Sequence, residues 1–126
     1  MTDVLTVSEA AARVGLSAHT LRWYEQVGLV SPVGRDTAGR RRYGPDDVRQ
    51  LDFLTKLRGT GMPVREMLNY VQLARSGPHT GPQRRALLEA HRRRVLARVA
   101  ELQRDLEVIN YKIDTYACSD PGRCDI

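Results

Sequence analysis

The chain has 126 residues, of which 41% are hydrophobic and 6% aromatic, and it carries a formal net charge of +5 with a pI of about 9.7. This length suffices for one compact domain and one long element but excludes an enzyme with a large enclosed cleft, and the basic balance suits a polyanionic partner. The sequence has no membrane-length apolar run and no N-terminal segment of signal-peptide type, so we expect a cytoplasmic protein without membrane contact.

A short helix is predicted between Ser8 and Gly15. Ser8 is a natural N-cap, and Gly15 can take the left-handed conformation that ends a helix. Ala10, Ala11 and Val14 share one face, which we expect to be buried. The residues VGLS then form a turn into a second helix, as in a helix-turn-helix.

The second helix is predicted from its N-cap Ser17 to Gly28, which closes it. Leu21 and Tyr24 are spaced to face the core. The opposite face carries Ala18, His19 and Arg22. Arginine suits bidentate contact with guanine, and histidine can donate to a base edge or a phosphate. Because this face enters the major groove in helix-turn-helix proteins, the pattern predicts a DNA-reading surface.

An arginine-rich hairpin is predicted next. An extended run begins at Leu29 and ends at Arg35, and the residues DTAG at 36–39 have the composition of a hairpin loop. The second strand contains three consecutive arginines, Arg40, Arg41 and Arg42. Neighbouring side chains on a strand alternate faces, so at most two of these point to one side. We expect this wing to contact phosphates.

Two more helices are predicted before a linker. The residues GPDD at 44–47 start the first, with proline in the first turn and two carboxylates near the positive end of the helix dipole. Its buried stripe is Val48, Leu51, Leu54 and Leu57. The residues GTG at 59–61 break it, and the next helix has a stripe of Val64, Met67, Leu68, Val71 and Ala74. Two glycines and two prolines within residues 76–82 predict a linker.

These segments together resemble the DNA-binding domain of the MerR family of bacterial transcription regulators. The resemblance covers residues 5 to about 76 and is carried by TLRWYExxGL, GRRRY, DDVxxL and GMPVREM. It implies DNA contacts by the second helix and the wing, although Arg40 occupies a position that is often aromatic in the family. With the residues argued above, the candidate contacts are Ser17, Ala18, His19, Arg22, Trp23, Tyr24, Arg35, Arg40, Arg41, Arg42 and Tyr43.

A single long helix is predicted over residues 83–117. Apolar residues recur every seven positions, and a second series fills the alternate seam positions. The two series are Leu88, Val95, Leu102, Ile109 and Tyr116, and Val99, Leu106 and Ile113. A rod on the order of 50 Å is too long to bury its stripe on so small a domain, so we expect a homodimer. The resemblance implies that the two helices pair as an antiparallel coiled coil.

A two-fold protein reads a two-fold operator whose half-sites are separated by whole turns of duplex. Family members, by resemblance, bend and untwist a promoter whose spacer is too long for RNA polymerase, which makes polymerase an indirect partner. An effector then activates or represses transcription by changing the relative stability of two dimer geometries.

Both cysteines, Cys118 and Cys124, lie in the tail and flank an Asp-Pro-Gly turn. Two thiolates suit Cu(I) or part of a zinc site, and they could equally form a reversible disulfide. Metal-sensing MerR proteins carry a cysteine pair just after the dimerisation helix. The ends of the third and long helices resemble instead the branch that responds to aldehydes and nitrosative stress, which typically has a cysteine where this chain has Lys56. The effector stays open between metal and thiol stress, and incidental thiols without a sensing role are the remaining alternative.

The predicted fold class is mainly α, a winged helix-turn-helix followed by a long dimerisation helix. The predicted segments are a DNA-binding domain (1–76), a linker (77–82), a dimerisation helix (83–117) and an effector tail (118–126). The alternative function is a DNA-architectural protein without an effector. No enzyme is expected, because the sequence has no catalytic motif and His19, His79 and His91 lie on three separate predicted elements.

Overall fold

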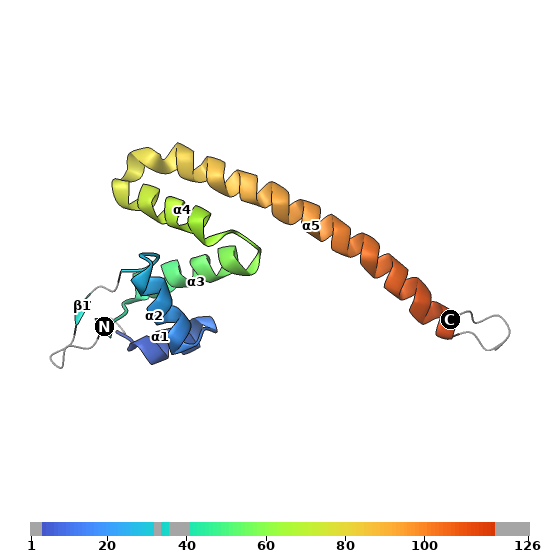
Figure 1. Ribbon diagram of the computed structural model, residues 1–126, viewed down its shortest axis with the longest axis horizontal. Helices are drawn as coiled ribbons and strands as arrows, with labels where there is room; N and C mark the ends of the chain where they lie inside the picture. Colours follow the sequence, from blue (N-terminus) through green and yellow to red (C-terminus); the bar gives the residue numbers. More distant parts are fainter. Residues whose placement is uncertain (1–3, 32–33, 36–40, 118–126) are drawn as a thin grey trace. The chain divides into compact units, whose positions relative to one another are not determined.

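The computed structural model describes residues 4–31, 34–35 and 41–117, and at residues 34, 35 and 41 it describes the backbone alone. The chain forms two compact units, Met1–Arg85 and Ala86–Ile126. The first contains helices α1 to α4 and a two-stranded wing, and the second contains most of the long helix α5 (Figure 1). The predicted loop at 36–39, Arg40, Cys118 and Cys124 lie outside the described residues. The predicted segment boundaries stay a prediction.

Helix α1 (Val7–Val14) begins two residues earlier than a cap at Ser8 would allow. Its N-cap is Thr6, whose hydroxyl accepts a hydrogen bond from the Glu9 amide at 3.2 Å, while the Thr6 amide donates to Glu9 Oε1 at 3.0 Å. This reciprocal pair is a capping box, and the T-x-x-E spacing that produces it is visible in the sequence. The prediction of Ser8 as the cap is therefore wrong. Gly15 ends the helix at φ 78°, as predicted.

Helix α2 (Ala18–Gln26) is capped at its start by Ser17, whose hydroxyl accepts from the Thr20 amide at 3.0 Å. At its end Gly28 has a φ of 91°, and the Leu29 amide donates back to the Tyr24 carbonyl at 2.9 Å. A left-handed glycine and this backward bond are the usual close of a helix. The prediction that Ser17 caps the helix and Gly28 closes it is confirmed.

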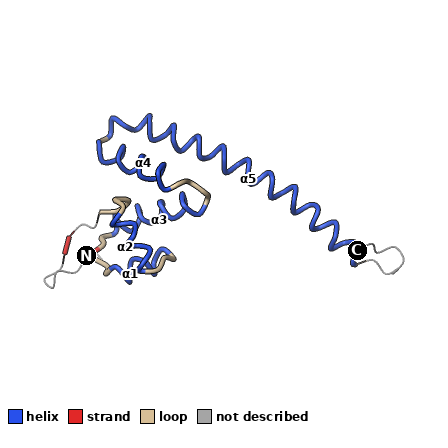
Figure 2. Tube along the Cα trace, viewed as in Figure 1, coloured by secondary structure: helices blue, strands red, loops and turns tan. Residues whose placement is uncertain are grey.

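The wing consists of β1 (Gly34–Arg35) and β2 (Arg41–Arg42), which pair antiparallel with Gly34 opposite Arg42 (Figure 2). Strand β1 is much shorter than the extended run predicted from Leu29. Leu29 and Val30 are 0% and 6% exposed. Burial in the core and the hydrogen bond from the Leu29 amide to the Tyr24 carbonyl hold these two residues, and they do not belong to β1.

Helix α3 (Pro45–Gly59) starts as predicted, with Pro45 in the first turn and the Gly44 amide donating to Asp47 Oδ2 at 2.9 Å. Helix α4 (Val64–Ser76) follows the break at Gly61, which has a φ of 98°. The first unit has a core of side chains from α1, α2, α3 and α4 and from the segments between them. Its largest fully buried members are Leu21, Leu29, Tyr43, Leu51, Leu54, Met62, Met67 and Val71.

Helix α5 (Gly81–Tyr116) begins before the predicted start at residue 83. The short 3-10 turn Pro78–Thr80 precedes it, so glycine and proline at 81 and 82 belong to the helix. Proline is tolerated in a first helical turn, where its missing amide would have no intrahelical partner. None of the described helices is both long and apolar enough to cross a bilayer.

Candidate nucleic-acid interface

The outer face of α2 presents an exposed mixture of basic and aromatic side chains. His19 and Arg22 are exposed, and Trp23 is 41% exposed. Leu21, on the opposite face, is fully buried and fixes the rotation of the helix. The structure therefore groups three of the predicted contact residues on one accessible surface, where guanidinium, imidazole and indole groups can reach a duplex.

Two of the predicted contact residues belong instead to the core. Tyr24 is 4% exposed and packs its ring against Trp23, with the ring centroids 5.8 Å apart, while Tyr43 is 1% exposed. Burial raises the pKa of Tyr24, and the nearby Arg58 charge opposes that rise. Because their side chains are buried, Tyr24 and Tyr43 do not belong to the exposed contact surface; they stabilise the packing beneath α2 and at the end of β2.

The base of the wing is tied to the start of the chain. Leu5 and Tyr43 form an antiparallel bridge, and each amide donates to the other's carbonyl at 2.8 Å. Arg42 of β2 lies close enough to Glu9 of α1 to affect its ionisation. These contacts hold Arg42 and Tyr43 beside α1, so the end of β2 has a fixed position in the first unit.

The Glu9 carboxylate gives the capping box a pH dependence. The hydrogen bonds with Thr6 hold the pKa of Glu9 below its ordinary value of 4.5, and the charges of Arg42 and Arg13 lower it further. A depressed pKa adds stability above pH 4.5, and this is lost as the pH falls through the folded-state value. Thermal unfolding should therefore show a deficit for Glu9→Gln at pH 6 that disappears near pH 3. A deficit that grows on acidification would contradict the assignment.

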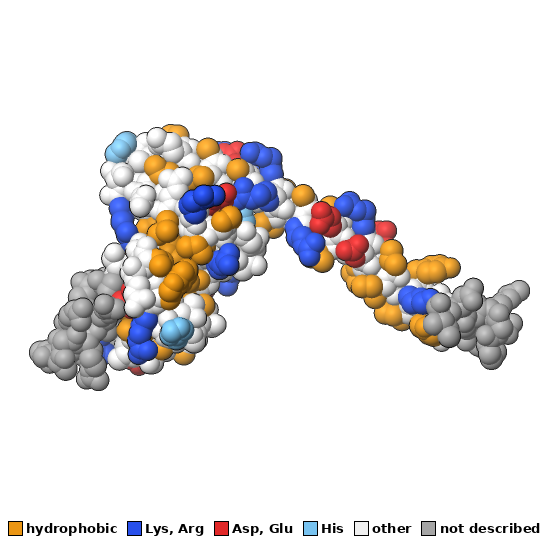
Figure 3. Space-filling view, in the orientation of Figure 1, with side chains coloured by type: hydrophobic (Ala, Val, Ile, Leu, Met, Phe, Trp, Pro, Cys, Tyr) orange, Lys and Arg blue, Asp and Glu red, His pale blue; other side chains and the backbone are white. Residues whose placement is uncertain are grey.

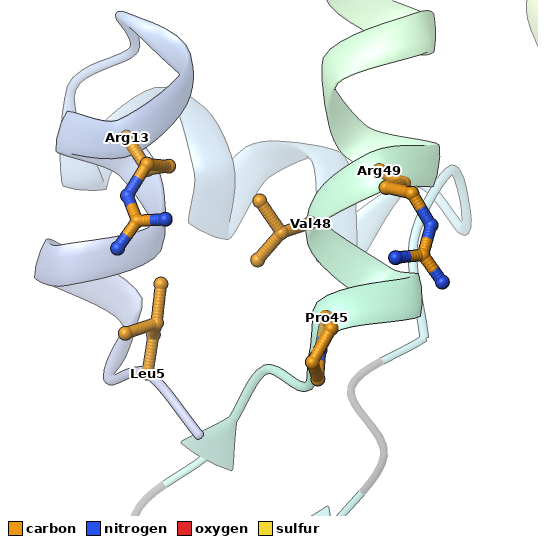
Figure 4. Close-up of a pocket in the computed structure, with 5 residues that line it drawn as sticks. All are labelled: Leu5, Arg13, Pro45, Val48 and Arg49. Atoms are coloured by element: carbon orange, nitrogen blue, oxygen red, sulfur yellow. The ribbon is translucent and has the colours of Figure 1, made fainter. Parts of the chain in front are cut away.

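A groove of about 250 Å³ lies between α1 and α3, lined by Leu5, Arg13, Pro45, Val48 and Arg49 (Figure 4). The two guanidinium groups flank an apolar floor, and Arg49 is already ion-paired with Asp46 one turn earlier. The groove is smaller than the roughly 300–1,000 Å³ of ordinary ligand pockets. We assign it no ligand.

The second unit exposes an apolar stripe along α5. Val99, Leu102 and Leu106 are 42%, 51% and 52% exposed, and the stripe continues to the end of the helix through Ile109, Ile113 and Tyr116. Apolar side chains appear along much of the helix in the space-filling view (Figure 3). Leu88 and Val95, at the beginning of the stripe, are partly buried. A stripe of this length is typical of a surface that another helix covers.

No three His, Cys, Asp or Glu side chains among the described residues lie close enough to hold a metal ion. Lys56, at the position where the resemblance expects a cysteine in one branch, is exposed on α3 and lies 3.6 Å from Asp52. The described residues thus contain neither of the two thiols of the chain.

Comparison with known proteins decides the family. Residues 5–73 match the model of the MerR helix-turn-helix family of regulatory proteins, and residues 48–109 match the model described as "MerR, DNA binding". The chain belongs to the MerR family. An uncharacterized helix-turn-helix transcriptional regulator of Haemophilus influenzae is 36% identical over 111 residues, which are 88% of this chain and 82% of the relative.

Two further MerR-type proteins support the assignment. The transcriptional regulator AdhR of Bacillus subtilis is 33% identical over 73% of this chain and 66% of its own length. The crystal structure of HiNmlR, described as a MerR family regulator lacking the sensor domain and bound to promoter DNA, superposes with a TM-score of 0.82. It is 36% identical and covers 93% of this chain and 91% of that one. The predicted fold class, mainly α with a winged helix-turn-helix followed by a long helix, is confirmed, and this chain is a DNA-binding transcription regulator of the MerR family, whose members are not enzymes.

Proposed function

We propose that this MerR-family chain binds a two-fold promoter operator as a homodimer. Residues 1–76 supply the DNA-binding domain, with reading by α2 and phosphate contacts by the wing, and residues 83–117 supply the dimerisation helix. The exposed apolar stripe of α5 carries the proposal, since a helix about 54 Å long requires a partner to cover it. The proposed seam is Leu88, Val95, Val99, Leu102, Leu106, Ile109, Ile113 and Tyr116.

The dimer would act by deforming the duplex. Two reading helices held by one antiparallel coiled coil fix the distance between the half-sites, and a change in dimer geometry then bends or untwists the DNA between them. Such a deformation costs several kcal/mol, which is large enough to control transcription without a large change in affinity. RNA polymerase would respond to the altered promoter, so its partnership is indirect. The site of action would be the cytoplasm.

The proposal is tested by selecting binding sites for the full chain from a pool of random duplexes. The expected result is an inverted repeat with half-sites related by whole helical turns, bound by two chains. A single asymmetric site bound by one chain would contradict the proposed homodimer. The alternative, an architectural protein, predicts that the selected duplexes share no consensus sequence and that the affinity falls steeply as the salt concentration rises.

We further propose that Cys118 and Cys124 read the signal. Cys118 and Cys124 stand two and eight residues after Tyr116, the last residue of α5, so a bond or metal ion that joins them would act close to the end of the dimerisation helix. The reduced chain is titrated anaerobically with Cu(I) and Zn(II) against a chelator, beside the double variant Cys118→Ser, Cys124→Ser. Tight binding that the variant loses establishes a metal signal. Equal binding by both proteins removes metal and favours thiol oxidation, which mass spectrometry of the oxidised chain then tests.

A further inference from the structure

One hydrogen bond joins the segment leading into the wing to the far end of α4. Arg75 Nη2 donates to Ser31 Oγ at 3.2 Å, although the two residues are 44 positions apart in the chain. Both side chains are exposed, so the bond is not a by-product of core packing. Ser31 stands three residues before Gly34, the first residue of β1.

The Ser31 end of this bond is anchored by the core. Leu29 and Val30 are buried immediately before it, and the Leu29 amide is bonded to the Tyr24 carbonyl of α2. The residue after Ser31 is a proline, which disfavours helical backbone at Ser31. The main chain is thus held by the core up to Val30, and the serine hydroxyl is the last described side chain before β1.

The Arg75 end is anchored where α4 meets α5. Thr80 is 3% exposed, and its hydroxyl lies 2.6 Å from the Leu73 carbonyl and 2.8 Å from the Gly77 carbonyl. Arg84, in the first turn of α5, donates from Nε to the same hydroxyl at 3.1 Å. These bonds hold the last turn of α4, which carries Arg75, against the beginning of α5.

We propose that Arg75 is a positioning residue for the wing. Its bond to Ser31 completes a series of contacts that runs from Arg84 through Thr80 and the last turn of α4 to Ser31, the last described residue before β1, entirely within the first unit. It fixes the point from which the chain continues into the wing, so less of the wing's position is left to be set when DNA binds, and it couples that point to the start of the dimerisation helix. This role rests on the proposed contact between the wing and DNA.

A direct contact between Arg75 and a phosphate is the competing explanation, and the two are separable. A phosphate contact releases a counterion, so its loss reduces the salt dependence of binding by about one unit of slope. A positioning bond leaves that slope unchanged. It also makes the effects of Ser31 and Arg75 non-additive, because removal of either partner already breaks the bond.

The test compares Arg75→Met, Ser31→Ala and the double variant on the selected operator. Methionine keeps an unbranched, flexible stem and removes the donor and the charge. We expect each single variant to raise the Kd about three- to tenfold and the double variant to be no weaker than the weaker single, with an unchanged salt slope. The Tm should stay within about 2 °C of the parent, since an exposed bond contributes little to global stability.

Additive effects with a reduced salt slope for Arg75→Met would overturn the proposal in favour of a phosphate contact. Unchanged binding by both single variants would overturn it as well. The pair Arg40→Ala, Arg41→Ala serves as the reference for the wing and spares Arg42, which lies near Glu9. If the double variant Arg40→Ala, Arg41→Ala weakens DNA binding while the Arg75 variants do not, only the proposed role of Arg75 is refuted. If that double variant binds DNA like the parent protein, the proposed contact between the wing and DNA is refuted, and the role of Arg75 with it.

Discussion

Leu102→Glu is expected to raise the dissociation constant of the dimer by about 10²- to 10⁴-fold. Leu102 is 51% exposed in the single chain and lies near the middle of the proposed seam. Burying a leucine contributes about 1.5–3 kcal/mol, and two copies are lost for each dimer, or about 3–6 kcal/mol. Every 1.4 kcal/mol changes the constant tenfold, and desolvating the new carboxylates adds a further cost.

Sedimentation equilibrium measures the dissociation constant of the dimer directly. Operator binding should weaken as the dimer dissociates, because a monomer contacts only one half-site. Val108→Glu is the matched control. Val108 is 69% exposed and lies on α5 outside both seam positions, so its variant should remain dimeric. An intact Leu102→Glu dimer, or equal dissociation of both variants, would show that the heptad assignment is wrong.

Local signals in the sequence were sufficient for most helix ends. Ser17, Gly15 and Gly28 act as predicted because capping depends on a few neighbouring residues and on backbone geometry that glycine alone adopts cheaply. The same rule, applied to the Thr6 and Glu9 pair, would have found the true start of α1. Glycine and proline at 81 and 82 predict a linker, whereas the structure places them in the first turn of α5, where proline is tolerated.

Features that depend on tertiary packing could not be predicted from local sequence patterns. Tyr24 and Tyr43 occupy positions that the resemblance assigns to DNA contact, yet packing buries both rings. The sequence predicts an extended run from Leu29 to Arg35, whereas β1 covers only Gly34–Arg35 and the side chain of Leu29 is buried in the core. The bond between Ser31 and Arg75 has no sequence signal, because nothing in either neighbourhood specifies a partner 44 residues away.

Arg22→Ala is expected to weaken operator binding about 5- to 150-fold and to relax specificity at one base pair of each half-site. Arg22 is exposed on the outer face of α2, next to His19 and Trp23 on the surface opposite buried Leu21. A bidentate arginine–guanine contact contributes about 1–3 kcal/mol of discrimination, which is lost without the guanidinium. Titration of operator, single-substitution operators and random duplex measures both effects.

The comparison with random duplex decides what Arg22 touches. A base contact predicts a large loss on the operator and a small loss on random DNA, whereas a phosphate contact predicts equal losses and a smaller salt slope. Arg13→Ala controls for the removal of one positive charge, since Arg13 lies on α1 beside the groove and not on the reading face (Figure 4). If Arg13→Ala and Arg22→Ala weaken both duplexes alike, α2 does not read sequence through Arg22, and the specificity of the operator must come from its other exposed side chains or from DNA shape.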